Sequence, residues 1–171
     1  NDMLVGGLGN DTYFVDSASD VVVESLNDGM ADIVFSSVGY TLGAAQEVEN
    51  LTYTGTANAF LSGNSLDNIL DGSAAGINTL IGGDGNDTLI VNAERLGSLD
   101  GGAGTNRLRV LGDSLSWNDA ALNNIQVLDL ASISTLAGSV SVTLGGNAPS
   151  LNTIIGSAKS DRFTFSSVAQ M

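Results

Sequence analysis

The sequence predicts an all-β protein in which short parallel strands and tight turns wind into a solenoid. Three observations support this prediction: a nine-residue repeat, a short apolar segment after each glycine-rich turn, and a hydrophobic fraction of 43% with only one proline. That fraction is enough to build a core in spite of a net charge of −14. A length of 171 residues limits the chain to one or two structural units.

The repeat has the form GGxGxDxUx, where U is a large apolar residue. It occurs as GGLGNDTYF at 6–14, as GGDGNDTLI at 82–90 and, with Asn106 in place of aspartate, as GGAGTNRLR at 101–109. Its first six residues predict a tight turn, because glycine and asparagine tolerate positive φ. Its last three predict a very short strand with one inward side chain. Two repeats then complete a coil of about 18 residues, so turns one coil apart stack on the same edge.

Weaker copies are recognised by the sixth position of the repeat, which an apolar residue follows two positions later. One series is Asp2, Asp11, Asp20 and Asp32, and the other is Asn68, Asn78, Asp87, Gly97 and Asn106. The spacings predict that Asp11 shares an edge with Asp32, Asp2 with Asp20, and Asp87 with Asn68 and Asn106. The turns at Asp20 and Asp32 lack the double glycine.

Composition and charge limit the kinds of metal site, catalysis and partner that this chain can have. The chain has no histidine and no cysteine, which excludes imidazole and thiolate metal sites and catalysis by either group. Residues 1–106 carry 15 of the 19 acids and only one base, Arg95. This imbalance disfavours nucleic acid as a partner and favours cations. No apolar run approaches the roughly 20 residues of a membrane-spanning helix, so we expect no membrane insertion.

A metal in this chain must be held by oxygen, and stacked turns offer backbone carbonyls together with the sixth-position carboxylate. Calcium takes six to eight oxygen ligands at about 2.3 to 2.6 Å. The turns at 6–11 and 82–87 are the leading candidates. The predicted calcium-binding residues are Asp2, Gly6, Gly7, Leu8, Gly9, Asp11, Asp20, Asp32, Asn68, Gly82, Gly83, Asp84, Gly85, Asp87, Gly101, Gly102, Gly104 and Asn106.

Two alternatives to direct ligation remain. Asp84 and Asp100, which lie near the turns, fit solvated surface acids as well as ligands. The turns as a whole also fit plain solenoid loops, in which Asn and Asp side chains form hydrogen-bonded ladders without an ion.

The repeats resemble the hemolysin-type calcium-binding (RTX) nonapeptide family. The stretches at 9–24, 32–55 and 61–72 are similar to the segments found between nonapeptide blocks in large exported bacterial proteins. The resemblance implies a parallel β-roll, or right-handed β-helix solenoid, with calcium-binding turns. It also implies export by a type I secretion system and a secreted, extracellular or cell-surface location in a bacterium.

The neutral second part of the chain is predicted to continue the solenoid. We expect residues 1–109 to form the calcium-binding roll with a spacer at about 36–62. Residues 110–171 then form a metal-poor β-helix continuation or cap, with a last degenerate repeat at 156–164. Period-two patterns predict strands at 108–111, 125–130, 140–144 and 153–155. Residues 116–122 are predicted to start a short helix or turn.

Together these patterns predict a calcium-binding structural module of a secreted protein and no enzyme. We expect the metal-free array to be largely unfolded, because stacked carboxylates repel one another, and to fold when calcium binds outside the cell. One alternative is a calcium-stiffened repeat of an adhesin, surface-layer or filament protein that self-assembles or contacts neighbouring domains. A weaker alternative is an accessory module of an extracellular carbohydrate-active enzyme.

Overall fold

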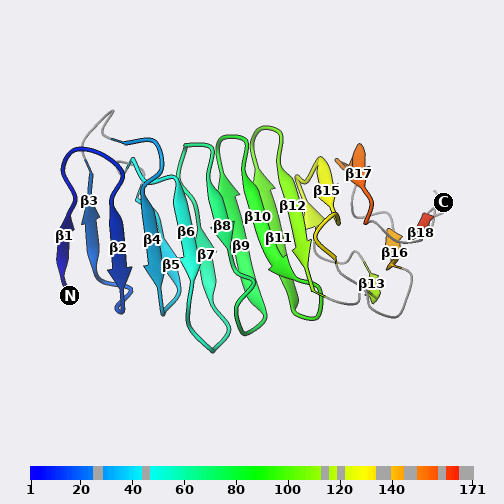
Figure 1. Ribbon diagram of the computed structural model, residues 1–171, viewed down its shortest axis with the longest axis horizontal. Helices are drawn as coiled ribbons and strands as arrows, with labels where there is room; N and C mark the ends of the chain where they lie inside the picture. The colour runs from blue at the N-terminus through cyan, green and yellow to red at the C-terminus, as the bar shows by residue number, and fades with distance from the viewer. Residues whose placement is uncertain are drawn as a thin grey trace, which may run out of the picture.

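The protein is an elongated β-solenoid whose coils stack from β1 (Met3–Val5) at one end to β17 (Thr153–Ile155) and β18 (Asp161–Phe165) at the other (Figure 1). The computed structural model describes residues 1–24, 29–43, 47–112, 116–118, 122–133, 140–144, 150–157 and 161–165. Within these residues there are strands and turns but no helix. All strand pairs that they form are parallel, which confirms the predicted fold class.

Two long sheets form the walls of the solenoid. The larger has the order β17-β15-β12-β10-β8-β6-β4-β2 and the smaller the order β14-β11-β9-β7-β5. Besides β17, the larger sheet contains β2 (Thr12–Val15), β4 (Ile33–Ser36), β6 (Asn50–Tyr53), β8 (Ile69–Asp71), β10 (Thr88–Asn92), β12 (Arg107–Leu111) and β15 (Val127–Asp129). The smaller contains β5 (Tyr40–Thr41), β7 (Phe60–Ser62), β9 (Asn78–Gly83), β11 (Leu96–Gly102) and β14 (Leu122–Asn123).

Two small sheets lie toward the ends of the chain. At the start, β1 pairs with β3 (Val21–Val23). Near the end, β16 (Val140–Leu144) pairs with both β13 (Ser116–Asn118) and β18. The part of the chain that the structure describes holds no helix with the length and hydropathy of a membrane span.

The core is built from stacked inward side chains. Successive strands of the larger sheet place leucines in register at 51, 70, 89, 108 and 128, and the smaller sheet does the same at 61, 80 and 99. All of these leucines are fully buried in one apolar cluster. This is the arrangement that the U position of the repeat predicts. It yields a thin core, because a strand of three to five residues directs only one or two side chains inward.

The coils are not of one length. The expected 18 residues separate Met3 from its partner Val21, but 17 residues separate Ile33 from Asn50 and 26 separate Val127 from Thr153. The extra residues lie between the strands, so the strands stay in register and the turn residues that precede them still stack. The stretch 36–62, which the sequence assigns to a spacer, contributes β5, β6 and β7 to the two walls.

The second part of the chain contains all four predicted strands, as β12, β15, β16 and β17. β15 and β17 extend the larger sheet beyond residue 109. The helix or turn predicted to begin at Ser116 is wrong there, because residues 116–118 form β13. Parallel pairing of β13 with β16 outweighs the local capping signal of Ser116 and Asn118. Residues 119–121, which complete that prediction, lie outside the described residues, as do residues 158–160 of the last repeat.

Candidate metal centre

One edge of the solenoid carries a ladder of side-chain oxygens. At this edge a backbone N–H immediately before a strand of the larger sheet donates to the side chain at the same position in the next coil. The distances from nitrogen to oxygen are 2.6 to 2.8 Å. The rungs join Asp11 to Asp32, Asp32 to Glu49, Asn68 to Asp87, Asp87 to Asn106, and Asn106 to Gln126. Between Glu49 and Asn68 the link is made by the Asn68 amide, which donates to the carbonyl of Glu49 at 3.3 Å.

The ladder brings alternate members of both series to one edge, Asp11 and Asp32 from the first and Asn68, Asp87 and Asn106 from the second. Asp11 lies beside Asp32, and Asp87 lies between Asn68 and Asn106, as their spacing predicts. The sequence analysis missed Glu49 and Gln126, which occupy the same position in their coils. The signal was available, because each of them precedes a buried leucine by two residues.

The side-chain amides of Asn68 and Asn106 form hydrogen bonds to the backbone through both their oxygen and their nitrogen. Asn106 Oδ1 accepts the N–H of Asp87, and its Nδ2 donates to the carbonyl of Asn124 at 3.0 Å. Asn68 Oδ1 accepts the N–H of Asn64, and its Nδ2 donates to the carbonyl of Val48 at 3.2 Å. This is the ladder of the alternative interpretation, and neither amide depends on an ion for its hydrogen bonds.

The aspartate rungs differ, because a carboxylate has no proton to donate. Asp32 and Asp87 each use Oδ1 to accept a ladder N–H. The Oδ2 atoms of Asp11, Asp32 and Asp87 are buried and have no hydrogen-bond partner. Asp32 is 0% exposed and Asp87 is 1% exposed, so water does not compensate for the missing partner. A buried anionic oxygen in this condition needs a cation or a proton.

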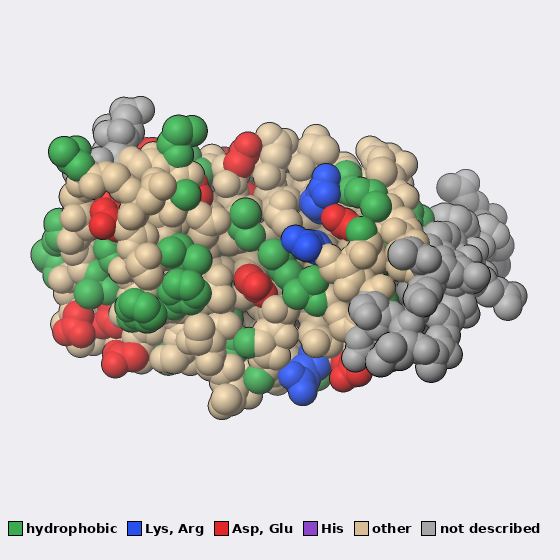
Figure 2. Space-filling model, in the orientation of Figure 1, with side chains coloured by type: hydrophobic (Ala, Val, Ile, Leu, Met, Phe, Trp, Pro, Cys, Tyr) green, Lys and Arg blue, Asp and Glu red, His purple; other side chains and the backbone are tan. Residues whose placement is uncertain are grey.

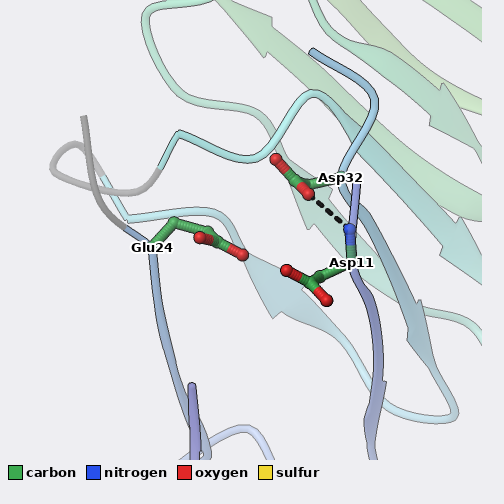
Figure 3. Close-up of side chains that lie close together, drawn as sticks. All are labelled: Asp11, Glu24 and Asp32. Carbon is green, nitrogen blue, oxygen red and sulfur yellow. Dashed lines mark hydrogen bonds between the residues drawn. The ribbon is translucent and has the colours of Figure 1, made fainter. Parts of the chain in front are cut away.

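Three carboxylates converge at the first two coils (Figure 3). Asp11 precedes β2 and Asp32 precedes β4 in the larger sheet, and Glu24 follows β3 in the small β1–β3 sheet. One oxygen atom from each lies within 4.8 Å of the others. At an effective dielectric constant of about 20, two unit charges about 4 Å apart repel by about 4 kcal/mol, so three ionised groups oppose folding unless a cation lies among them.

Glu24 is a ligand candidate that the sequence analysis missed. The register of β1 with β3 pairs Val5 with Val23, so Glu24 occupies the position that the first glycine of a nonapeptide, Gly6, occupies one coil earlier. The lack of a double glycine in the Asp32 turn therefore has a structural meaning. A buried acid replaces the glycine and directs its carboxylate toward the turn of the preceding coil.

Gly6 leaves the space that these oxygens surround. A Cβ on Gly6 would overlap Tyr13 OH and Glu24 Oε1 and would lie 2.6 Å from Asp11 Oδ2. Tyr13 OH is buried and has no hydrogen-bond partner. On the far side of the turn, a Cβ on Gly29 would lie 2.6 Å both from Asp32 Oδ2 and from the carbonyl oxygen of Gly9. Carboxylate and phenol oxygens thus lie together beside Gly6, and a carboxylate and a carbonyl oxygen lie together beside Gly29.

The donor set and the spacing fit calcium. Two oxygens bound to one calcium at about 2.3 to 2.6 Å lie no more than about 5.2 Å apart, and the three carboxylates meet this limit. A hollow of about 320 Å³, lined in part by Gly6, Asp11 and Tyr13, lies beside the Asp11 end of the cluster. Residues Asp11, Glu24 and Asp32 would hold the ion, and the ion would supply the positive charge that the buried oxygens lack.

The predicted turn at 82–87 contains one carboxylate of this kind. A Cβ on Gly82 would overlap both Asp87 Oδ2 and the carbonyl oxygen of Gly101, so two acceptors lie beside the same point. Burial raises the pKa of Asp87 to about 6, the Asn68 N–H opposes this rise, and the charges of Asp67 and Asp84 add to it. Asp84 is exposed and lies outside the cluster of carboxylates at the first coils.

Asp20 is used differently from the other predicted ligands. Its carboxylate accepts backbone N–H groups from Asp2 at 2.8 Å, Ser17 at 3.1 Å and Asp16 at 3.3 Å. The hydrogen bond from Asp2 is the foremost cause that holds the pKa of Asp20 below its usual range. Asp2 and Asp20 therefore lie on one edge as predicted, but Asp2 takes part through its backbone, and Asp20 already has donors.

The turn glycines have the backbone conformation that the repeat predicts. Positive φ angles occur at Gly7, Gly9, Gly83, Gly85, Gly102 and Gly104. The first glycines, Gly6, Gly82 and Gly101, are instead the residues at which a Cβ would overlap the ladder side chains. Leu8 is 93% exposed, so only its backbone lies near the turn. Metal binding by any of these residues remains a prediction.

No protein-family model, curated protein or solved structure matches this chain.

The raised pKa of Asp87 predicts that the metal-free protein becomes less stable as the pH rises. Its carboxyl keeps a proton up to a pH of about 6 in the folded chain but loses it near 3.8 in the unfolded chain. The free energy of unfolding should therefore fall as the pH rises through this interval. Urea denaturation in chelator between pH 4 and 7.5 measures this, with Asp87→Asn as the comparison. Parallel pH profiles for the two proteins would contradict the prediction.

Proposed function

We propose that this chain is a calcium-binding structural module that folds outside the cell when it binds calcium, as in secreted bacterial proteins of the RTX type. The observation that carries the proposal is the cluster of Asp11, Glu24 and Asp32, in which two buried Oδ2 atoms lack any hydrogen-bond partner. The repeat pattern and the charge of the first part of the chain support the same conclusion.

The chemistry of the cluster favours calcium over other cations. All its donors are hard oxygen atoms, which suit calcium and magnesium and not the softer transition metals. Magnesium requires ligands at about 2.0 to 2.1 Å in a near-octahedral shell and loses water reluctantly. A site made of turns from two coils, with carboxylates and carbonyls on several sides, suits the longer and more variable distances of calcium.

Calcium would act as a folding switch. Without it, buried carboxylates repel one another and the thin leucine core offers little to offset this. Extracellular modules bind calcium with dissociation constants of about 0.1 to 1 mM. At about ten times the dissociation constant, one site stabilises the folded state by about 1.4 kcal/mol. Low calcium inside a cell would shift the folding equilibrium toward the unfolded chain needed for export, and high calcium outside would shift it toward the folded chain.

Calcium should raise the melting temperature of the protein, because it binds only the folded state. The expected increase is about 3 to 6 °C for each site at about ten times its dissociation constant. Circular dichroism melts in chelator and in millimolar calcium measure it, with equal magnesium as a control. Glu94→Gln, which removes an exposed charge outside the cluster, should respond as the wild type does. A melting temperature that calcium does not change would remove the proposal.

Gly6→Ala should block the first site without changing any charge. Its methyl group would occupy the space between Asp11, Glu24 and Tyr13. We expect a loss of terbium luminescence sensitised by Tyr13 and a smaller calcium-dependent rise in melting temperature. Gly112→Ala is the matched control, because it lies outside the ladder, a Cβ there would be in ordinary contact with Ala93 at 3.5 Å, and the residue has φ +120°. That variant should lower stability equally with and without calcium.

A second candidate function is assembly, as in a filament or adhesin repeat. The outer face of β1 and β3 exposes Met3, Val5, Val21 and Val23 in adjacent register. Hydrophobic side chains gather at this end on the face shown in Figure 2. Exposed apolar patches of this kind often mark interaction surfaces.

Light scattering with and without calcium separates the two candidates. A pure folding module should remain a monomer in calcium. An assembly repeat should form larger species in calcium, and Val5→Lys should disrupt them because it places a charge in the apolar face. A monomer under all conditions would remove this second candidate and leave the first in place.

A further inference from the structure

Asp87 and Asn106 form a natural matched pair. They occupy the same ladder position in consecutive coils, since Thr88 pairs with Arg107 in the parallel register. Each follows the first glycine of its own turn by five residues, Gly82 for Asp87 and Gly101 for Asn106. Each also accepts an N–H from the preceding coil through Oδ1, at 2.8 Å in both cases. The two side chains therefore differ only in their second polar atom, which is Oδ2 in Asp87 and Nδ2 in Asn106.

The surroundings of that second atom are also equivalent. A Cβ on Gly101 would overlap the carbonyl oxygen of Asn124 and the Nδ2 of Asn106. Here the amide donates to the carbonyl at 3.0 Å. A Cβ on Gly82 would overlap the carbonyl oxygen of Gly101 and the Oδ2 of Asp87. Here both atoms are acceptors, and the carboxylate oxygen is buried without a hydrogen-bond partner.

We propose that the residue at the ladder position decides, coil by coil, whether calcium is needed: an asparagine places its own N–H where an aspartate would require the cation. This inference rests on the proposed function, since it assumes that calcium is the ion that the aspartate rungs take. It identifies the amide group as an internal replacement for the metal. Asn106 is then a metal-independent rung, and Asp87 is a metal-dependent one.

The order of the ladder residues gives this rule a direction along the chain. The acidic rungs Asp11, Asp32 and Glu49 come first, and the amide rungs Asn68, Asn106 and Gln126 dominate the later coils. In a solenoid each coil contacts only its neighbours, so stability is local. Calcium dependence should therefore be concentrated in the coils of the acidic rungs Asp11, Asp32 and Glu49 and around Asp87, and the coils of the amide rungs should be less sensitive.

The reciprocal exchange of the two side chains tests the rule. Asp87→Asn places an N–H beside the Gly101 carbonyl, and Asn106→Asp removes the N–H beside the Asn124 carbonyl. Hydrogen exchange of the full chain is followed at the backbone amides of β10 and β12, in chelator and in millimolar calcium. Glu94→Gln serves as the control for the loss of an exposed charge.

Asp87→Asn should slow exchange at β10 in chelator by about tenfold, because a hydrogen bond replaces a buried unpartnered anion. The additional protection that calcium confers on β10 should then disappear. Asn106→Asp should do the reverse at β12, with faster exchange in chelator and a new protection by calcium. If the Asn106→Asp variant does not fold in chelator, protection of its β12 amides after calcium is added is the equivalent result.

The outcomes separate the inference from the proposed function. If calcium protects no part of the wild-type chain, the proposed function fails. If calcium protects the wild type but Asp87→Asn exchanges faster in chelator, or keeps the full calcium effect at β10, the rule fails while the proposed function stands. Equal calcium protection in all coils of the wild type would also overturn the rule.

Discussion

The fold depends on how each coil satisfies the backbone N–H that precedes its strand on the larger sheet. At this edge the chain leaves a turn and enters a strand, and the donor lies within the stack of turns in a buried or partly buried hydrogen bond. The side chain at the same position of the next coil accepts it through one oxygen. Aspartate, asparagine, glutamate and glutamine can all do this, which explains why the position tolerates these four residues and why the turns stack in register.

The same constraint creates the chemistry of the edge. Each ladder side chain must offer one acceptor oxygen, but this requirement does not determine whether its second polar atom is an oxygen or a nitrogen. Where it is an amide nitrogen, as in Asn106, the group completes its own hydrogen bonds with a neighbouring carbonyl. Where it is a second oxygen, as in Asp32 and Asp87, an anionic atom stays buried among carbonyl oxygens. The need for a cation at Asp32 and Asp87 is thus a consequence of the backbone hydrogen bond that each of them accepts.

The first coils show how this demand becomes a site. Asp11 and Asp32 belong to the ladder, but Glu24 follows the strand β3 of the small β1–β3 sheet and reaches the same turn because Gly6 leaves room for it. The buried side chains of Tyr13, Val22 and Val34 belong to the apolar core and hold these coils together beside the cluster. Because the core is thin, the balance between apolar burial and charge repulsion is close, and binding of one ion can change it.

The repeat in the sequence was sufficient for the solenoid, the parallel strands, the inward leucines and the pairing of Asp11 with Asp32 and of Asp87 with its asparagines. These features follow from a nine-residue period and from the preference of glycine and asparagine for tight turns, which are local properties. The sequence did not reveal Glu49 and Gln126 as ladder residues or the role of Glu24. Because the coils differ in length, equivalent positions of successive coils are not equally spaced in the sequence. Nor did the sequence reveal that Asp20 is already held by three backbone donors, or that Ser116–Asn118 pairs as a strand. These features depend on contacts between residues in different coils or far apart in the chain, and such contacts exist only when the coils are stacked.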